Sequence, residues 1–286
     1  MISDITLGQY FPGFSVLHKL DPRTKLILAA LFIVTVFLAN NPFAFLVLFA
    51  LSFVLVLVSR ISFKVILKGL KPVIFILIFT AFLNVFLTKG KGEPLVDWGF
   101  LKIFEEGIVR AVFMAIRVII LIMGSSLLLT YTTSPISLTD GLESLLSPLK
   151  KIKVPVHSFA MMMSIALRFI PTLVEETDKI MNAQKSRGAD FSSGGLIKRA
   201  KALIPILVPL FISAFKRADE LAIAMECRCY RGDYKRTKMV KLTYKLRDFL
   251  WIGFFAVVLG VLIASRIVPY KFEVDSLIYD ILFYKI

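Results

Sequence analysis

Long apolar runs separated by short polar segments dominate this chain. We interpret five of these runs as membrane-spanning helices: Leu26–Leu38, Pro42–Val58, Val73–Leu87, Ile108–Tyr131 and Leu250–Ile267. The first two are separated by Asn40-Asn41-Pro42, which favours a tight turn and predicts a helical hairpin. The pattern therefore predicts an all-α, polytopic membrane protein with about five spans.

The composition supports this class. Hydrophobic residues make up 57% of the 286 residues and the mean hydropathy is +0.80, whereas soluble domains are roughly 45–50% apolar. Many of the 26 Phe lie in long apolar runs, which lack the alternation with polar residues that the strands of a membrane barrel would require. We therefore expect helices that face lipid.

The net charge of +15 suggests nucleic acid binding at first sight. In so apolar a chain it is better explained by Lys and Arg retained on the cytoplasmic side of the spans. We interpret Arg60, Lys64, Lys68 and Lys71 as a cytoplasmic loop, and residues 89–106 and the tail at 272–286 as external. This assignment predicts a multi-pass cell-membrane protein with a cytoplasmic N-terminus, whose partners include the lipid bilayer but not nucleic acid.

The charge distribution also divides the chain. Residues 1–131 hold four spans, and residues 249–286 hold the last span and the short external tail. Residues 132–248 contain 20 Lys plus Arg against 11 Asp plus Glu, and we predict that they form a cytoplasmic domain. Within the fourth span, Arg110 can reach the interface, whereas Arg117 is expected to face protein or water.

Three helices are predicted within residues 132–248. Leucines at helical spacing from Leu138 to Leu149 indicate a short amphipathic helix along the membrane or against the spans. Ser158 to Ser186 forms a long helix that is apolar at first and charged later. A second long helix runs from Leu196 to about Tyr230 and contains Pro205 and Pro209, which suggest a kink.

Both long helices finish in a charged stretch with an arginine near the end. The first finishes in Ser186-Arg187-Gly188, where Gly188 can form an ordinary left-handed C-cap. The second finishes in Cys227-Arg228-Cys229, and Arg231-Gly232 follows shortly after. An ordinary cap explains either end alone, but the duplication favours two exposed arginines that dock into acidic or carbonyl-lined grooves of a partner.

Catalytic and metal chemistry find little support. Cys227 and Cys229 lie in a segment placed in the cytoplasm, and His18 and His157 are distant from them in sequence, so neither a disulfide nor a metal site is expected. No Gly-rich phosphate-binding loop and no Ser, His and carboxylate grouping occurs. We therefore expect a protein without catalytic residues or cofactors. Asp21 before Pro22 predicts an N-capped helix start.

Several segments together resemble a known family, the transmembrane T components of energy-coupling factor transporters, related to CbiQ. The resemblance rests on residues 18–25 (HKLDPRTK), 132–135 (TTSP), 148–150 (PLK), 168–171 (RFIP), 183–190 (AQKSRGAD) and 217–226 (RADELAIAME). It covers nearly the whole chain. The combination is highly specific, although each short piece alone is weak.

The resemblance implies a non-catalytic coupling subunit of an ATP-driven importer of vitamins or trace metal ions. Members of this family dock two ATPase subunits, identical or different, through Ala-Arg-Gly signatures at the ends of two coupling helices, and act on a small membrane subunit that binds the substrate. The first signature corresponds to Ser186-Arg187-Gly188. The second corresponds to Cys227-Arg228-Cys229, which departs at both flanking positions, so Arg231 with Gly232 stays a reserve candidate.

Two other functions fit the residues alone. A stand-alone secondary transporter would bind its substrate between spans, and a membrane scaffold would need only helices and a docking surface. The first three predicted spans carry almost no charge, which disfavours the transporter.

Overall fold

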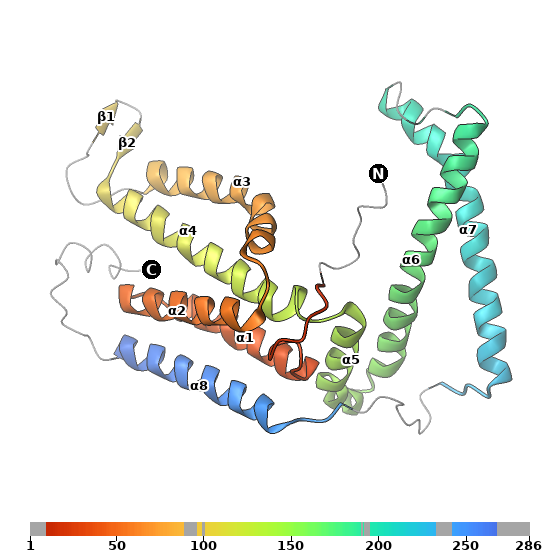
Figure 1. Cartoon of the computed structure of the whole chain (residues 1–286). Coiled ribbons are helices and arrows are strands. Elements are labelled where there is room, and N and C mark those ends of the chain that lie inside the picture. The colour runs from red at the N-terminus through yellow and green to blue at the C-terminus, as the bar shows by residue number, and fades with distance from the viewer. Residues whose placement is uncertain are drawn as a thin grey trace. The chain divides into compact units, whose positions relative to one another are not determined.

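The computed structural model describes residues 10–88, 96–98, 101–189, 191, 195–232 and 242–267 (Figure 1). The α-helices of these residues are α1 (Pro22–Leu38), α2 (Pro42–Ser59), α3 (Phe63–Leu87), α4 (Glu105–Ser125), α5 (Pro135–Leu145), α6 (Val156–Ser186), α7 (Leu196–Cys227) and α8 (Leu246–Ile267). The only sheet within the described residues is an antiparallel ribbon of β1 (Val96–Trp98) and β2 (Leu101–Ile103). The predicted all-α class is confirmed. Half of the predicted external loop (residues 89–95 and 99–100) and the whole tail lie outside the described residues.

Within the described residues, five helices are long and apolar enough to cross a membrane. Four of them contain predicted spans, namely α2, α3, the segment Gly107–Thr130 and α8. The fifth is α6, because the first half of its 31 residues is largely apolar and contains Arg168 as its one Asp, Glu, Lys or Arg. The predicted span Leu26–Leu38 lies in α1, which at 17 residues is at the short end of the roughly 17–25 residues that a span needs.

Two predicted boundaries were wrong, each for a local reason. α3 begins at Phe63, so Lys64, Lys68 and Lys71 lie in a helix and not in a loop. Their spacing follows one helical face, and lysine is a good helix former. The amphipathic helix predicted to reach Leu149 ends at Leu145 instead. Ser147–Ile152 is a 3₁₀-helix, because Pro148 cannot continue an α-helix that precedes it.

The chain forms two compact parts, which we call the membrane part (residues 10–134 and 242–267) and the hairpin part (residues 135–232). The core of the membrane part is built around α1, which packs against α4 and α8. Phe32 of α1 is fully buried, and its ring centroid lies 6.5 Å from that of Phe255 on α8. Gly124 of α4 faces the same ring, so a side chain there would collide with Phe32.

Arg117 binds protein groups, as its position in an apolar span predicts. Its Nη2 donates to the carbonyl oxygen of Ala39 at 2.6 Å and to Oδ1 of Asn40 at 3.4 Å. Its guanidinium carbon also lies 5.4 Å from the ring centroid of Phe45. These contacts tie α4 to the turn between α1 and α2, because that turn leaves a carbonyl without a helical partner.

A buried polar cluster, the Lys25 cluster, holds the start of α1 and consists of Asp21, Lys25, Thr132 and Asp248. Asp21 caps α1 by accepting from the backbone N–H of Arg23 at 2.9 Å, which confirms the predicted cap. The backbone N–H of Asp21 donates to Oδ1 of Asp248 at 2.9 Å. Nζ of Lys25 donates to the carbonyl oxygen of Thr132 at 2.7 Å. All four residues are at most 8% exposed.

The Gly124→Ala substitution tests the contact between α1 and α4. The new Cβ would lie 2.2 Å from Cε1 and Cζ of Phe32, a fully buried side chain that has little room to move. We expect a loss of about 1–3 kcal/mol in the free energy of unfolding. The matched control is Gly253→Ala on α8, where no heavy atom lies within 4 Å of the added Cβ. Equal unfolding temperatures of the two variants in detergent would contradict this packing.

The burial of Lys25, which precedes the predicted first span, should make the free energy of unfolding depend on pH. Burial lowers the pKa of its ammonium group to about 8, although the charges of Asp21 and Asp248 oppose the shift. The unfolded chain therefore binds more protons than the folded chain between pH 8 and 10.5, so stability rises with pH over this interval. We expect the natural protein to gain up to about 3 kcal/mol over this interval relative to Lys25→Met. Denaturant unfolding of both proteins at several pH values measures this, and a constant difference would contradict it.

Candidate functional site

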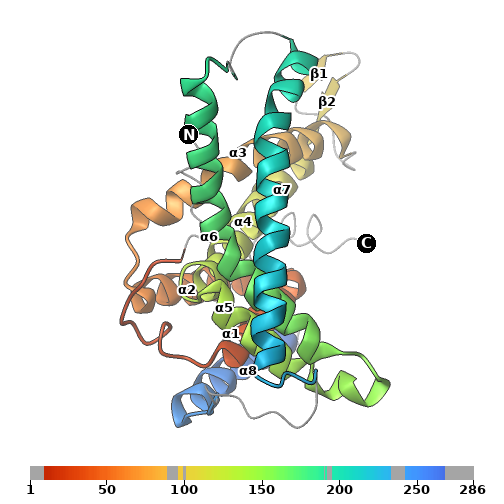
Figure 2. The ribbon, with the colours of Figure 1, turned by 90° about the vertical axis from the view of Figure 1, so that its right-hand side faces the viewer.

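The two long helices of the hairpin part carry the candidate site. α6 and α7 have 31 and 32 residues and pack side by side in opposite directions (Figures 1 and 2). Their observed bounds agree with the two long helices predicted from the sequence. Because α6 and α7 are antiparallel, their C-terminal ends lie at opposite ends of the hairpin.

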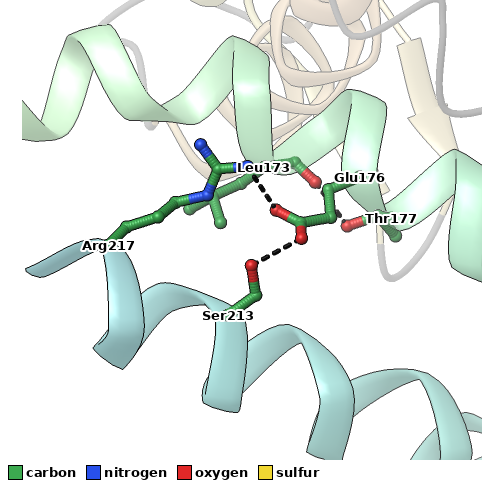
Figure 3. Close-up of polar contacts among 5 residues, drawn as sticks. All are labelled: Leu173, Glu176, Thr177, Ser213 and Arg217. Carbon is green, nitrogen blue, oxygen red and sulfur yellow. Dashed lines mark hydrogen bonds and ion pairs between the residues drawn. The ribbon is translucent and has the colours of Figure 1, made fainter. Parts of the chain in front are cut away.

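A carboxylate on α6 links the two helices (Figure 3). Oε1 of Glu176 accepts from Oγ of Ser213 at 2.5 Å, and its Oε2 accepts from Nη2 of Arg217 at 3.2 Å. The Arg217 side chain is 39% exposed and that of Glu176 is 22% exposed, so water weakens the ion pair. The contact nevertheless defines the register of the two helices, because one carboxylate binds side chains a turn apart on α7.

This link is placed symmetrically between the two candidate arginines. Arg187 follows Glu176 by eleven residues along α6, and Arg228 follows Arg217 by eleven residues along α7. At 1.5 Å per residue, each arginine lies about 16 Å from the link, in opposite directions. The two arginines are therefore separated by roughly 30–35 Å along the hairpin. The contact between Glu176 and Arg217 was not predicted from the sequence. The equal spacing of Glu176 and Arg217 from the two helix ends could have indicated it.

The end of α6 forms a complete Schellman cap. The backbone N–H of Gly188 donates to the carbonyl oxygen of Lys185 at 3.0 Å, and that of Ala189 donates to Gln184 at 3.0 Å. Gly188 has φ +84°, the left-handed conformation that this cap needs, as the sequence predicted. Arg187 occupies the C-cap position, and Ser186 is the last helical residue.

The end of α7 repeats this geometry without a glycine. The backbone N–H of Cys229 donates to the carbonyl oxygen of Glu226 at 2.8 Å, and that of Tyr230 donates to Met225 at 3.0 Å. Cys229 has φ +57° and thus takes the place of the glycine. Arg228 therefore occupies the same C-cap position as Arg187, with Cys227 as the last helical residue. The loss of glycine does not abolish the turn.

The reserve candidate has a different geometry. Gly232 also has a positive φ, +70°, but α7 has already ended at Cys227. Arg231 therefore lies beyond the helix, on the stretch that follows the cap. Of the two alternatives, only Arg228 is the geometric counterpart of Arg187.

Both cap arginines can contact a partner. Arg187 and Arg228 are exposed, and neither guanidinium has a hydrogen bond or ion pair with any described residue. A cation at a helix C-terminus is favourable because the unpaired carbonyls there carry partial negative charge. The planar guanidinium presents five N–H donors, so each helix end can bind carboxylates or backbone carbonyls of another protein.

The cysteines and histidines of the hairpin part do not gather in the stretches that the structure describes. Cys227 and Cys229 are free and exposed, and no group of three potential metal ligands occurs there. His157 has a different role, because its Nδ1 lies 2.9 Å from Oε1 of the buried Glu143. This contact fixes α5 against the start of α6.

Substitutions at Cys229 test the second cap. Cys229→Gly should stabilise the end of α7 by about 1 kcal/mol, because glycine adopts the left-handed conformation without steric penalty. Cys229→Val should destabilise it, and Cys227→Ala within the helix serves as the control. Hydrogen exchange of the Tyr230 amide, which bonds to Met225, reports the cap. Faster exchange in Cys229→Gly than in the natural protein would contradict the assignment.

Comparison with known proteins identifies the family. Residues 13–240 match the CbiQ family, described as cobalt transport protein. The "Energy-coupling factor transporter transmembrane protein EcfT" of Clostridium kluyveri is 54% identical over 93% of this chain and 98% of its own length. The proteins of the same name from Ruminiclostridium cellulolyticum and Bacillus subtilis are 57% and 51% identical, over 88% and 87% of this chain and 94% and 93% of their own lengths. This chain therefore belongs to the EcfT family, the transmembrane proteins of energy-coupling factor transporters.

Proposed function

We propose that this chain is the non-catalytic coupling subunit of an ATP-driven micronutrient importer and that Arg187 and Arg228 dock two ATPase subunits. One observation carries the proposal: two exposed arginines occupy identical cap positions at opposite ends of one cross-linked helix hairpin. Ser186 and Gly188 flank the first arginine, and Cys227 and Cys229 flank the second. The name of the relatives, which refers to energy coupling in a transporter, supports this function.

The separation of the arginines supports two docking sites. Each cap arginine fills one groove at most, and roughly 30–35 Å along the hairpin is too far for a single groove to bind both. The equal spacing of the arginines from the Glu176 link suits two partners of similar shape, either two copies of one ATPase or two related ATPases. ATP binding and hydrolysis take place in these partners.

An exposed apolar face on the hairpin suits a third partner. The large apolar side chains exposed along the middle of α7 are Leu203, Ile204, Leu207, Val208, Phe211, Ile212 and Phe215. A continuous apolar face of this kind requires a hydrophobic partner or lipid to cover it. We assign it to a small membrane subunit that binds the substrate, which the hairpin reorients when the ATPases move.

The proposed orientation follows from the charges. The hairpin part lies in the cytoplasm with the ATPases, and the N-terminus lies on the same side. In this proposal the excess of Lys and Arg keeps the hairpin part on the cytoplasmic side, and two of these residues, Arg187 and Arg228, dock the ATPases. Nucleic acid has no role in this proposal.

The double substitution Arg187→Ala and Arg228→Ala tests the docking function. Each single substitution should weaken association with one ATPase by about tenfold or more, because it removes the central charged donor of a small contact. The double variant should lose both ATPases on co-purification and lose ATP-driven uptake in proteoliposomes. Arg231→Ala is the matched control, and this variant should keep both ATPases and ATP-driven uptake. Full assembly and uptake in the double variant would overturn the proposal, and uptake by the chain without ATPases would favour a stand-alone transporter.

A further inference from the structure

Between Tyr10 and Ile267, the backbone passes between the hairpin part and the membrane part at two places. The first passage is the peptide bond between Ser134 and Pro135, where α5 begins. The second leads to Leu242, where the chain re-enters the membrane part before α8. A displacement of the hairpin part is therefore passed along the backbone to the membrane part at these two places.

The backbone just before the first passage is held in place because two of its consecutive carbonyl groups accept hydrogen bonds from other segments. A π-helical turn, Ser126–Thr130, ends α4 and leaves the carbonyl groups of Tyr131 and Thr132 without helical partners. The backbone N–H of Phe11 donates to Tyr131 at 3.1 Å, and Nζ of Lys25 donates to Thr132 at 2.7 Å. Thr132 is 2% exposed. The segment that leads to α5 is therefore fastened to the start of α1.

The second passage is fastened to the same place. Asp248, which is 1% exposed, accepts from the backbone N–H of Lys245 through Oδ2 at 2.7 Å and from that of Asp21 through Oδ1 at 2.9 Å. Next to this bridge, the guanidinium carbon of Arg23 lies 5.3 Å from the ring centroid of Tyr244. Residues 244–248 are thus bound to the first turn of α1 by two independent contacts.

We propose that the Lys25 cluster is the anchor that transmits movement of the hairpin part to the spans, with Lys25 and Asp248 as positioning residues. The inference rests on the proposed coupling function. Its basis is that one buried cluster at the start of α1 binds both passages of the chain. Apolar side chains could fill the same space with equal or greater stability, but they would hold neither backbone segment in a fixed direction. The hydrogen bond from Lys25 to the Thr132 carbonyl and the one from the Lys245 backbone N–H to Asp248 do fix these two segments.

Two variants and a matched control test this inference. Lys25→Met removes the donor to Thr132 and replaces the side chain with an unbranched apolar one that is one atom shorter. Asp248→Asn is milder, because it removes the charge but retains one acceptor oxygen. Ser52→Ala is the control, since Ser52 is fully buried in α2 of the membrane part and its hydroxyl group has no hydrogen-bond partner.

The first measurement needs no partner proteins. Hydrogen exchange of the purified chain in detergent should be faster at residues 132–134 and 242–248 in both variants than in the natural protein, and unchanged in Ser52→Ala. Equal protection of these segments in Lys25→Met would overturn the anchor, whether or not the coupling function holds.

The second measurement is made on the complete transporter in proteoliposomes, where ATP hydrolysis and substrate uptake are recorded on the same sample. We expect both variants to assemble and hydrolyse ATP, while uptake per ATP hydrolysed falls at least about fivefold. A loss of folded protein alone would lower both rates together and leave this ratio unchanged, and that result would overturn the inference. Failure of the proposed coupling function would be visible separately, as absent ATP-driven uptake by the natural protein.

Discussion

The last carbonyl groups of an α-helix have no partners within the helix, and a chain this apolar cannot leave them bare. The main features of the structure are solutions to this one constraint. At the turn after α1, Arg117 binds the carbonyl group of Ala39. After the π-helical turn, Phe11 and Lys25 bind two consecutive carbonyl groups. At the ends of α6 and α7, the backbone folds back on itself in a Schellman cap.

The two Schellman caps explain why the arginines are presented alike. In this cap two backbone hydrogen bonds span the residue before the left-handed position and fix the backbone there. Arg187 and Arg228 both occupy that position, although one is followed by glycine and the other by cysteine. The Glu176 link then joins α6 to α7, so that the two caps lie at opposite ends of one helix hairpin.

The same constraint connects the hairpin to the spans. A helix that ended in water would satisfy the Thr132 carbonyl with solvent. This one ends in a buried site, where a side chain, that of Lys25, donates to it. The side chain is a lysine, whose charge is in turn offset by Asp21 and Asp248. Because Asp248 also binds the backbone before α8, the satisfaction of one carbonyl group brings both passages of the chain to the start of α1.

The sequence by itself determined the helical membrane class, most of the apolar helices, the Asp21 cap, the Gly188 cap and the duplicated arginines. These features are encoded locally, since an apolar run, an N-capping aspartate or a glycine after a helix specifies its own few residues. Tertiary structure decided what depends on distant residues. Asp21 and Asp248 are 227 positions apart and meet only when α1 packs on α8, and Glu176 reaches Arg217 only across the hairpin. The position of Arg228 also needed the structure, because a cysteine adopts the left-handed conformation of glycine only where the surrounding hydrogen bonds hold it there.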